Sequence, residues 1–428
     1  SNSTPSMLVA DKDEKIVAVM PSDTMGLGIT EIEAAIDQAL GDKAGIGRYG
    51  DAHVPLDEAN GRVLAREILA TQDVPPFDRA AMDGYAVVAE DTFGASRHEP
   101  HRLRCVETVH TAEIPTKRLE RGECTEIATG APMPDGADAV VMVEETDKGK
   151  DTEVQIFTPV YPCQHVGRQG ADIKTSQQLL DQGALLTPSR VGSIAALGIA
   201  EVEVFDRPRV AILSTGNEII EPGQSLAPGQ IYDINRFSLG AVIGEHGGIS
   251  VPYPTAADTL DSLGTVIDAC LANADDVLVF SGGSSVGERD LTLDILQRKG
   301  KVVFHGIAVK PGKPTVFGRI GSTPVFGMPG YPTSCLSNAY MLLVPLLRRL
   351  AHLPTHHMRT VTVPAAQRIV STTGRHQFYT VRVVEGTAVG AFKASGDITS
   401  MSQADGYIEI PAQTDIIEKS EIVEVKLF

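Results

Sequence analysis

The stretch LVFSGGSSVGERD, residues 278–290, combines an apolar strand, a glycine-rich turn and the start of a helix. Its strand, 277–280, is a short apolar run of the kind that lies buried in a parallel sheet. Gly282, Gly283 and Gly287 let the backbone approach a ligand closely, and backbone N–H groups at the start of the following helix can face an anion. The stretch therefore predicts an anion site at the end of a parallel strand.

Two carboxylates, Glu288 and Asp290, lie beside this predicted anion site. Carboxylates are unusual where only an anion binds, and they are expected where a divalent cation or a water must also be held. A tight strand–helix turn, with a solvated Asp that the helix dipole favours, explains the same segment. On this stretch alone the two interpretations have equal weight.

Two further turns favour the ligand site. KPGKP (310–314) places two lysines three residues apart in a turn stiffened by prolines, and FGMPGYPTS (326–334) opens onto an apolar helix predicted over 334–350. Because strand-end turns gather at the carboxyl edge of an open α/β sheet, where such folds bind ligands, we expect the three turns to form one site. The predicted substrate-binding residues in them are Ser281, Gly282, Gly283, Ser284, Gly312, Pro329, Gly330 and Ser334.

Composition indicates a multidomain globular protein. The length of 428 residues suggests about three domains, and the net charge of -18 argues against binding to nucleic acid or to an anionic membrane. An anionic ligand therefore needs a local basic pocket, for which Lys310 and Lys313 are the candidates. The five cysteines are scattered and include no C-x-x-C, which favours a reducing, cytoplasmic location. No stretch resembles a signal peptide or a membrane span.

The alternation of predicted elements divides the chain. Residues 1–27 are expected to form a flexible tail. Helical pattern on both sides of a strand-rich segment predicts a β domain (76–164) inserted into a helical linker domain (28–75 and 165–205). Strands and helices alternate over 206–354, which predicts an α/β domain with a mostly parallel sheet, and alternating strands over 355–428 predict a separate β domain.

Three carboxylates, Glu218, Asp258 and Asp290, each follow a different strand of the α/β domain. Such residues can converge on one cleft, and their oxygens suit Mg²⁺ held between protein and phosphates. Each alone is more often a helix cap, so the metal site depends on the set of three. The motifs of P-loop nucleotidases, serine hydrolases, zincins and dinucleotide-dependent dehydrogenases are absent from the sequence. The residues thus predict a Mg²⁺-assisted enzyme acting on a phosphorylated small molecule.

Six motifs occur in order along the chain: PPFDRAAMDGYA (75–86), TGAPMPDGADAVVMVEE (129–145), ILSTGNEI (212–219), SGGSSVGERD (281–290), KPGKP (310–314) and GMPGYPTS (327–334). Together they resemble those of the MoeA/gephyrin E-domain family, the molybdopterin molybdenumtransferases. The resemblance implies a helical linker domain, an inserted β domain, a three-layer α/β molybdopterin-binding domain and a C-terminal β-barrel-like domain. It also implies a homodimer, and the insertion of molybdenum from molybdate into adenylylated molybdopterin with Mg²⁺-dependent release of AMP.

The resemblance also implies roles for individual residues. The three strand-end carboxylates would hold Mg²⁺, the two lysines would neutralise phosphate or oxyanion charge, and an Asp of the inserted domain, by pattern alone an ordinary turn residue, would complete the cleft. The implied catalytic positions are Asp83, Thr129, Glu218, Asp258, Asp290, Lys310 and Lys313, and the implied molybdate contacts are Ser334, Arg375 and Ser400.

Three positions depart from the common family pattern: Gly306 replaces a basic residue, Tyr331 an Asn, and Asn217 an Asp. They leave tungstate open as the metal oxyanion. Two other functions also remain: a molybdopterin adenylyltransferase, which shares the α/β domain, and a non-catalytic scaffold of the gephyrin type. The additional domains disfavour the first, and the full set of carboxylates and lysines disfavours the second. Transient partners implied for the enzyme are a molybdopterin adenylyltransferase and acceptor molybdoenzymes.

Overall fold

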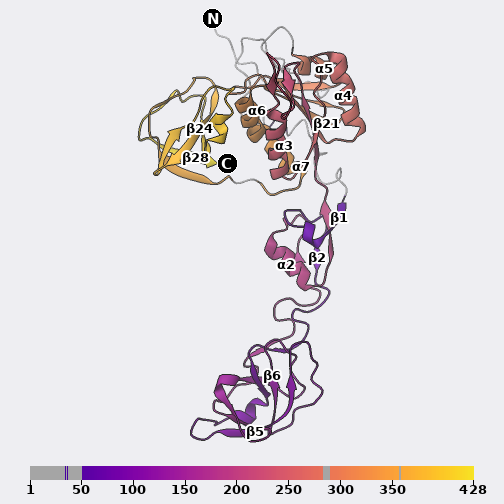
Figure 1. Ribbon diagram of the computed structural model, residues 1–428, viewed down its shortest axis with the longest axis vertical. Helices are drawn as coiled ribbons and strands as arrows, with labels where there is room; N and C mark the ends of the chain where they lie inside the picture. Colours follow the sequence, from indigo (N-terminus) through magenta and orange to yellow (C-terminus); the bar gives the residue numbers. More distant parts are fainter. Residues whose placement is uncertain (1–33, 35, 37–50, 283–289, 356–357) are drawn as a thin grey trace. The chain divides into compact units, whose positions relative to one another are not determined.

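The computed structural model describes residues 34, 36, 51–282, 290–355 and 358–428 (Figure 1). The chain divides into two compact units, of which the first contains Gly61–Val63 and Phe205–Phe428, and the second His53–Asn60 and Leu64–Val204. Among the described residues, no helix combines the length and apolar character needed to span a bilayer. The predicted substrate-binding residues Gly283 and Ser284 lie outside the described residues.

A six-stranded sheet forms the centre of the first unit. From edge to edge its strands are β16 (Ile249–Pro252), β13 (Arg209–Ser214), β17 (Val277–Ser281), β21 (Thr323–Met328), β20 (Val316–Ile320) and β18 (Lys301–His305). The first four strands run parallel, and β20 and β18 are antiparallel to their neighbours. The predicted mostly parallel sheet is confirmed, and the carboxyl ends of β13, β17 and β21 lie at one edge.

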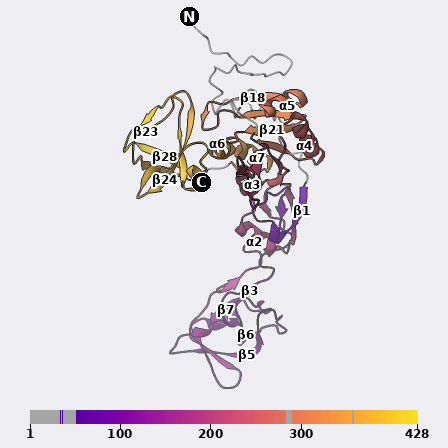
Figure 2. The same cartoon turned by 45° about the horizontal axis from the view of Figure 1, so that its top comes forward.

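Helices cover both faces of this sheet, as Figures 1 and 2 show. On β13, Val210 and Ile212 pack toward one set of helices, whereas Ala211 and Leu213 pack toward the other. Because successive side chains of a strand point to opposite faces, this partition gives three layers. One set is α3 (Asn235–Glu245), α6 (Pro332–Asn338), the π-helical turn η5 (Ala339–Leu343) and α7 (Val344–Leu350), and the other is α4 (Leu260–Ala272) and α5 (Leu291–Lys299).

The C-terminal strands form a second sheet of the first unit. In spatial order they are β19 (Val309–Lys310), β24 (His376–Val384), β26 (Gly406–Ile410), β28 (Ile422–Leu427) and β22 (Thr360–Pro364), with β25 (Thr387–Gly390) beside β24. β19 belongs in sequence to the α/β domain, yet it pairs with β24 and sets Lys310 opposite Gln377. The lysine turn is therefore anchored to the C-terminal sheet. The smaller elements are β14 (Ile219–Ile220), β15 (Ile231–Tyr232), β23 (Ile369–Val370), β27 (Ile416–Ile417) and α8 (Thr399–Ser402).

The inserted β domain lies in the second unit. Its strands in spatial order are β7 (Ala139–Met142), β4 (Gly84–Val87), β6 (Glu123–Ile127), β5 (His101–Val109), β9 (Glu153–Ile156) and β8 (Thr146–Lys148), with the 3-10 turns η3 (Ala89–Thr92) and η4 (Val143–Glu145). Gly84 begins the strand between β6 and β7, and a Cβ there would lie 1.9 Å from the carbonyl oxygen of Val141. Only glycine fits against β7 at this point.

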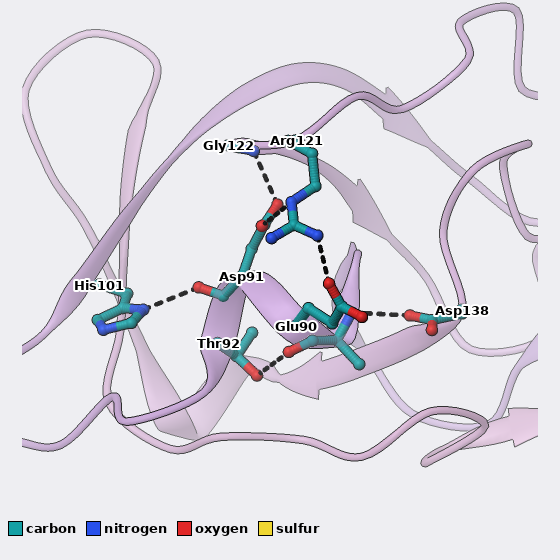
Figure 3. Close-up of polar contacts among 8 residues, drawn as sticks. Glu90, Asp91, Thr92, His101, Arg121, Gly122 and Asp138 are labelled. Carbon is teal, nitrogen blue, oxygen red and sulfur yellow. Dashed lines mark hydrogen bonds and ion pairs between the residues drawn. The ribbon is translucent and has the colours of Figure 1, made fainter.

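A polar network fixes η3 in the inserted domain (Figure 3). Arg121 pairs with both Glu90 and Asp91, and its Nε lies 2.8 Å from Asp91 Oδ1. Asp91 Oδ2 accepts from the backbone N–H of Gly122 at 2.7 Å, and Asp138 Oδ1 accepts from the N–H that opens η3, also at 2.7 Å. Arg121 and the backbone N–H groups satisfy the three carboxylates of this network, which indicates a structural role.

Short strands and one helix make up the described linker. They are β1 (Asp51–Pro55), η2 (Leu56–Glu58), β2 (Ile68–Leu69), β10 (Val166–Gly167), β11 (Gln178–Leu180), α2 (Pro188–Ala196) and β12 (Glu201–Phe205). The helical pattern predicted on the C-terminal side of the insertion is confirmed as α2. The antiparallel pair β2–β11 joins segments from the two sides of the insertion, and β10 pairs with β3 (Arg79–Ala80) at the start of the inserted domain. Strands therefore share the linker with the helix.

Candidate active site

Three strand ends meet closely at the carboxyl edge of the α/β sheet. The backbone N–H of Thr215, after β13, donates to the carbonyl oxygen of Ser281 at the end of β17 over 3.0 Å. Gly282 has φ +99°, and a Cβ there would lie 2.6 Å from the carbonyl oxygen of Thr215. A Cβ on Gly330 would touch the Cα of Gly282 at 3.4 Å, while Pro329 is buried beside it. The structure thus brings the predicted residues Ser281, Gly282, Pro329 and Gly330 together.

Polar side chains without partners lie at the same edge. Within the described residues, Thr215 Oγ1, Asp233 Oδ2 and Asn235 Oδ1 are buried without a hydrogen-bond partner, as is the hydroxyl of Ser214. The amide of Asn235 donates to the carbonyl oxygen of Gly330 over 2.8 Å, which places it beside the third turn. A buried unsatisfied polar atom costs about 1–3 kcal/mol, so each calls for a functional explanation. Sequence reasoning missed Asp233 and Asn235, whose one signal is an Asp-x-Asn at the start of a helix.

Glu218 and Asp258 form one carboxylate pair. Both side chains are exposed, and they follow β13 and β16 respectively. The pKa of Asp258 is raised, first because the surrounding protein removes part of its hydration and second because of the negative charge of Glu218. Two carboxylates that repel one another are a suitable pair of hard oxygen ligands for a divalent cation.

Asp290 forms a different pair. Its Oδ1 accepts from the backbone N–H of Leu293 at 3.1 Å and caps the start of α5. Its Oδ2 lies 3.4 Å from Nε2 of His305 on β18, a contact that the sequence did not predict. Capping of α5 accounts for the position of Oδ1, and Oδ2 faces the imidazole of His305. Over the described ranges, no three His, Cys, Asp or Glu side chains are grouped as a metal site.

The two lysines flank a rigid turn. Lys310 Nζ donates to Oγ1 of Thr372, from the C-terminal sheet, over 2.6 Å, and Lys313 is exposed. In the part of the chain that the structure describes, neither ammonium group is paired with a carboxylate. Gly312 between them has φ +114°, and a Cβ there would lie 2.4 Å from both Nδ2 and Oδ1 of the fully buried Asn338. The turn therefore presents two positive charges in a fixed arrangement.

The predicted molybdate contacts differ in their surroundings. Ser334 is 3% exposed near the start of α6, and Arg375 is half-buried immediately before β24. Ser400 is fully buried, and its Oγ accepts from the backbone N–H of Lys393 at 3.0 Å. Of the three, Arg375 carries the charge that an oxyanion requires.

In the inserted domain, Asp83 and Thr129 are bonded directly to one another. Oδ1 of Asp83 accepts from the backbone N–H of Thr129 at 2.7 Å and from its hydroxyl at 2.9 Å. These two bonds lower the pKa of Asp83, the backbone bond more than the hydroxyl bond. Both residues are exposed at the surface of the second unit. The pair is thus an ionised carboxylate on the surface, with one oxygen free for a further contact.

Known protein families match this chain over most of its length. Three family models match it: the MoeA N-terminal region (domain I and II) over residues 30–198, a probable molybdopterin binding domain over 211–349, and the MoeA C-terminal region (domain IV) over 362–428. Molybdopterin molybdenumtransferase 2 of Mycobacterium tuberculosis is 35% identical over 374 residues, which cover 85% of this chain and 91% of that protein. The chain belongs to the MoeA family. This membership confirms the resemblance inferred from the six motifs.

Other MoeA relatives agree in sequence and fold. The molybdopterin molybdenumtransferase of Haemophilus influenzae is 32% identical over 384 residues, covering 88% of this chain and 93% of that protein. A crystal structure of the MoeA protein of Pyrococcus horikoshii matches with a TM-score of 0.80 and 40% identity, covering 94% of this chain and 99% of that one. A second MoeA structure from the same organism matches with a TM-score of 0.77 and 29% identity over 94% and 100% of the two chains. The MoeA architecture therefore extends over almost all of the chain.

Proposed function

We propose that this MoeA family member is a molybdopterin molybdenumtransferase, which inserts molybdenum from molybdate into adenylylated molybdopterin with Mg²⁺-dependent release of AMP. The observation that carries the proposal is the arrangement at one sheet edge: carboxylates after β13 and β16, a carboxylate at the start of α5, and a lysine turn without carboxylate partners in the described residues. Such an arrangement suits a ligand that carries phosphate and a cation together.

The lysines would bind the phosphate groups of the substrate. A lysine ammonium is a compact charge suited to phosphate oxygens, and Lys310 is held in place by the hydroxyl of Thr372. Lys313 is exposed and free to reach a ligand at the rim. Gly312 and Asn338 keep the backbone between the two lysines in one conformation, so little conformational entropy is lost when a ligand binds.

The carboxylates would hold Mg²⁺, and their chemistry fits it. Glu218 and Asp258 are hard oxygen donors, and a cation between them would relieve the repulsion that raises the pKa of Asp258. Mg²⁺ usually takes one or two carboxylates together with waters and substrate phosphates, so a pair of carboxylates and a separate Asp290 meet its needs. When bound, the ion would polarise the phosphoanhydride.

Residues of the last domain would complete the site, and the inserted domain carries one further candidate residue. Asp83 keeps one carboxylate oxygen free after bonding Thr129, and we propose that this oxygen contacts the substrate. Arg375 would attract molybdate by its charge, with Ser334 and Ser400 supporting the same region. Because Oγ of Ser400 already accepts a hydrogen bond from the backbone N–H of Lys393, Ser400 would contact molybdate by donating its hydroxyl hydrogen.

We also propose a homodimer. Large apolar side chains on β15 and around the start of α3 are exposed, with Phe237 at 54% and Ile231 at 54%. Exposed large apolar side chains that gather within one short segment are typical of protein interfaces. Sedimentation of the full chain tests the proposal, and a monomer at micromolar concentration would contradict it. The exposed apolar residues are Leu226, Ile231, Tyr232, Ile234 and Phe237.

The reaction itself is tested by supplying adenylylated molybdopterin, Mg²⁺ and molybdate, and measuring AMP and molybdenum cofactor. The native chain is expected to form both, and Asp290→Asn is expected to lose about two orders of magnitude in turnover. Conversion of molybdopterin and ATP, without AMP release from the adenylylated substrate, would identify an adenylyltransferase instead. Full partner binding by an inactive chain, unaffected by Asp290→Asn, would identify a scaffold.

A further inference from the structure

Two cysteines of the inserted domain lie opposite one another on neighbouring strands. Cys105 of β5 and Cys124 of β6 are register partners, and these two strands run parallel. Side chains of register partners point to the same face, and both thiols pack in the same apolar cluster, beside Val87 and Leu103. Neighbouring strands are about 4.7–4.9 Å apart, which falls within the Cα separation of about 4.4–6.8 Å that a disulfide spans.

The two thiols differ in exposure and in acidity. Cys105 is half-buried, whereas Cys124 is fully buried. A hydrogen bond from the Cys124 thiol lowers the pKa of Cys105, and burial opposes this effect without cancelling it. The same hydrogen bond, with burial, raises the pKa of Cys124. Cys105 is therefore the thiol that ionises first and that solvent can reach, and Cys124 is placed to follow it.

We propose that Cys105 and Cys124 form a redox modification site, which a small-molecule disulfide converts into a reversible Cys105–Cys124 disulfide. A bond between directly adjacent strands lies near the short end of the separation that disulfides tolerate, and strained disulfides are the more easily reduced ones. The pair would therefore be reduced under ordinary cellular conditions and would respond to oxidation.

The chemistry proceeds in two exchange steps. The Cys105 thiolate attacks one sulfur of the small disulfide, forms a mixed disulfide with it and expels the other half as a thiolate. Cys124 then loses its proton to solvent, and its sulfur attacks Sγ of Cys105 and expels the second half. Two protein thiols are oxidised, one small disulfide is reduced to two thiols, and no other reactant is needed. Formation of the mixed disulfide removes the thiolate that opposed ionisation of Cys124, which favours the second step.

The position of the pair connects it to the surface carboxylate of this domain. Strand β6 leads directly to Thr129, and β4, which pairs with β6 through Cys124 and Val87, begins next to Asp83. A covalent link between β5 and β6 would fix β6, the strand that leads to Thr129. This consequence depends on the proposed function, whereas formation of the disulfide does not.

The experiment treats the reduced full chain with oxidised glutathione, alkylates the remaining thiols, and maps disulfides by peptide mass spectrometry. We expect one intramolecular link, between the peptides of Cys105 and Cys124, that dithiothreitol removes. Cys163, an exposed cysteine of the same domain, supplies the matched control, because Cys163→Ser should leave the link unchanged. Cys105→Ser, at a half-buried position that tolerates the hydroxyl, should abolish it and leave Cys124 free of glutathione.

A second variant separates the two steps. Cys124→Ala removes only the buried sulfur, so the mixed disulfide of Cys105 with glutathione should accumulate about tenfold above its level in the native chain. Circular dichroism of each variant establishes that the domain is folded. The proposal is overturned if glutathione stays attached to Cys105 in the native chain without a link to Cys124, or if both cysteines remain fully alkylated while Cys163 is oxidised.

Discussion

Gly312 offers the most direct test of how the lysine turn is held. Replacing it with Ala puts a methyl group 2.4 Å from the side-chain amide of Asn338, at a backbone φ of +114° that side chains rarely adopt. The strained backbone alone costs about 1–3 kcal/mol. The amide of Asn338 also donates to the carbonyl oxygen of Gly312 at 3.0 Å and to Oγ1 of Thr315 at 2.6 Å, and displacing it forfeits bonds worth about 1 kcal/mol each. We expect a total loss of about 3–5 kcal/mol.

Gly321 supplies the matched control for this prediction. It lies in the turn between β20 and β21 with φ +60°, and a methyl group added there would meet no atom within 4 Å, so Gly321→Ala should cost only about 1–2 kcal/mol. Hydrogen exchange of the buried strand β17, followed by mass spectrometry, reports the free energy of opening of this domain separately from the others. Equal losses for Gly312→Ala and Gly321→Ala would refute the claim that Asn338 fixes the turn.

Contacts of three other residues also lead to measurable expectations. Glu218→Gln should lower the pKa of Asp258, measured by carboxyl NMR. Because the raised pKa means that the fold favours the protonated form of Asp258, the free energy of unfolding should fall as pH rises through this titration. This fall should be smaller in Glu218→Gln than in the native chain. Gly84→Ala should selectively increase hydrogen exchange of β4, because its methyl group would meet a backbone carbonyl oxygen of β7. Lys310→Met should weaken binding of inorganic pyrophosphate about tenfold by calorimetry, whereas Lys299→Met, whose ammonium pairs with a carboxylate on α4, should not.

Much of the fold follows from periodicity in the sequence. The strands around residues 277 and 210 are fully buried on both faces and read as continuous apolar runs, and β28 (Ile422–Leu427) lies within the segment predicted to form alternating strands. These elements are predictable because burial on one or both faces dictates residue type along the strand. The pairing of β19 with the C-terminal sheet was not predictable, because it joins residues far apart in sequence through backbone bonds that carry no sequence pattern.

The candidate site, like the fold, has features that the sequence predicted and features that it did not. The turns and the lysines were visible in the sequence because glycine and proline mark special backbone conformations. The bonding of Asp83 to Thr129, and the pairing of Asp290 with His305, depend on how separate segments meet in space. The buried polar groups of Asp233 and Asn235 were missed for another reason: burial of a polar residue is a property of its neighbours and leaves no mark on its own position.

The proposal that the strand-end carboxylates serve one cation bound with a phosphate ligand is tested most directly by titrating Mn²⁺, as a paramagnetic substitute for Mg²⁺, into the chain in the presence of AMP. We predict that Glu218→Gln and Asp290→Asn each weaken Mn²⁺ binding about tenfold or more, since each removes an oxygen ligand. Asp268→Asn, at a carboxylate that pairs with Lys299 on another part of the domain, should leave it unchanged. Unaltered affinity in both Glu218→Gln and Asp290→Asn would contradict the proposal.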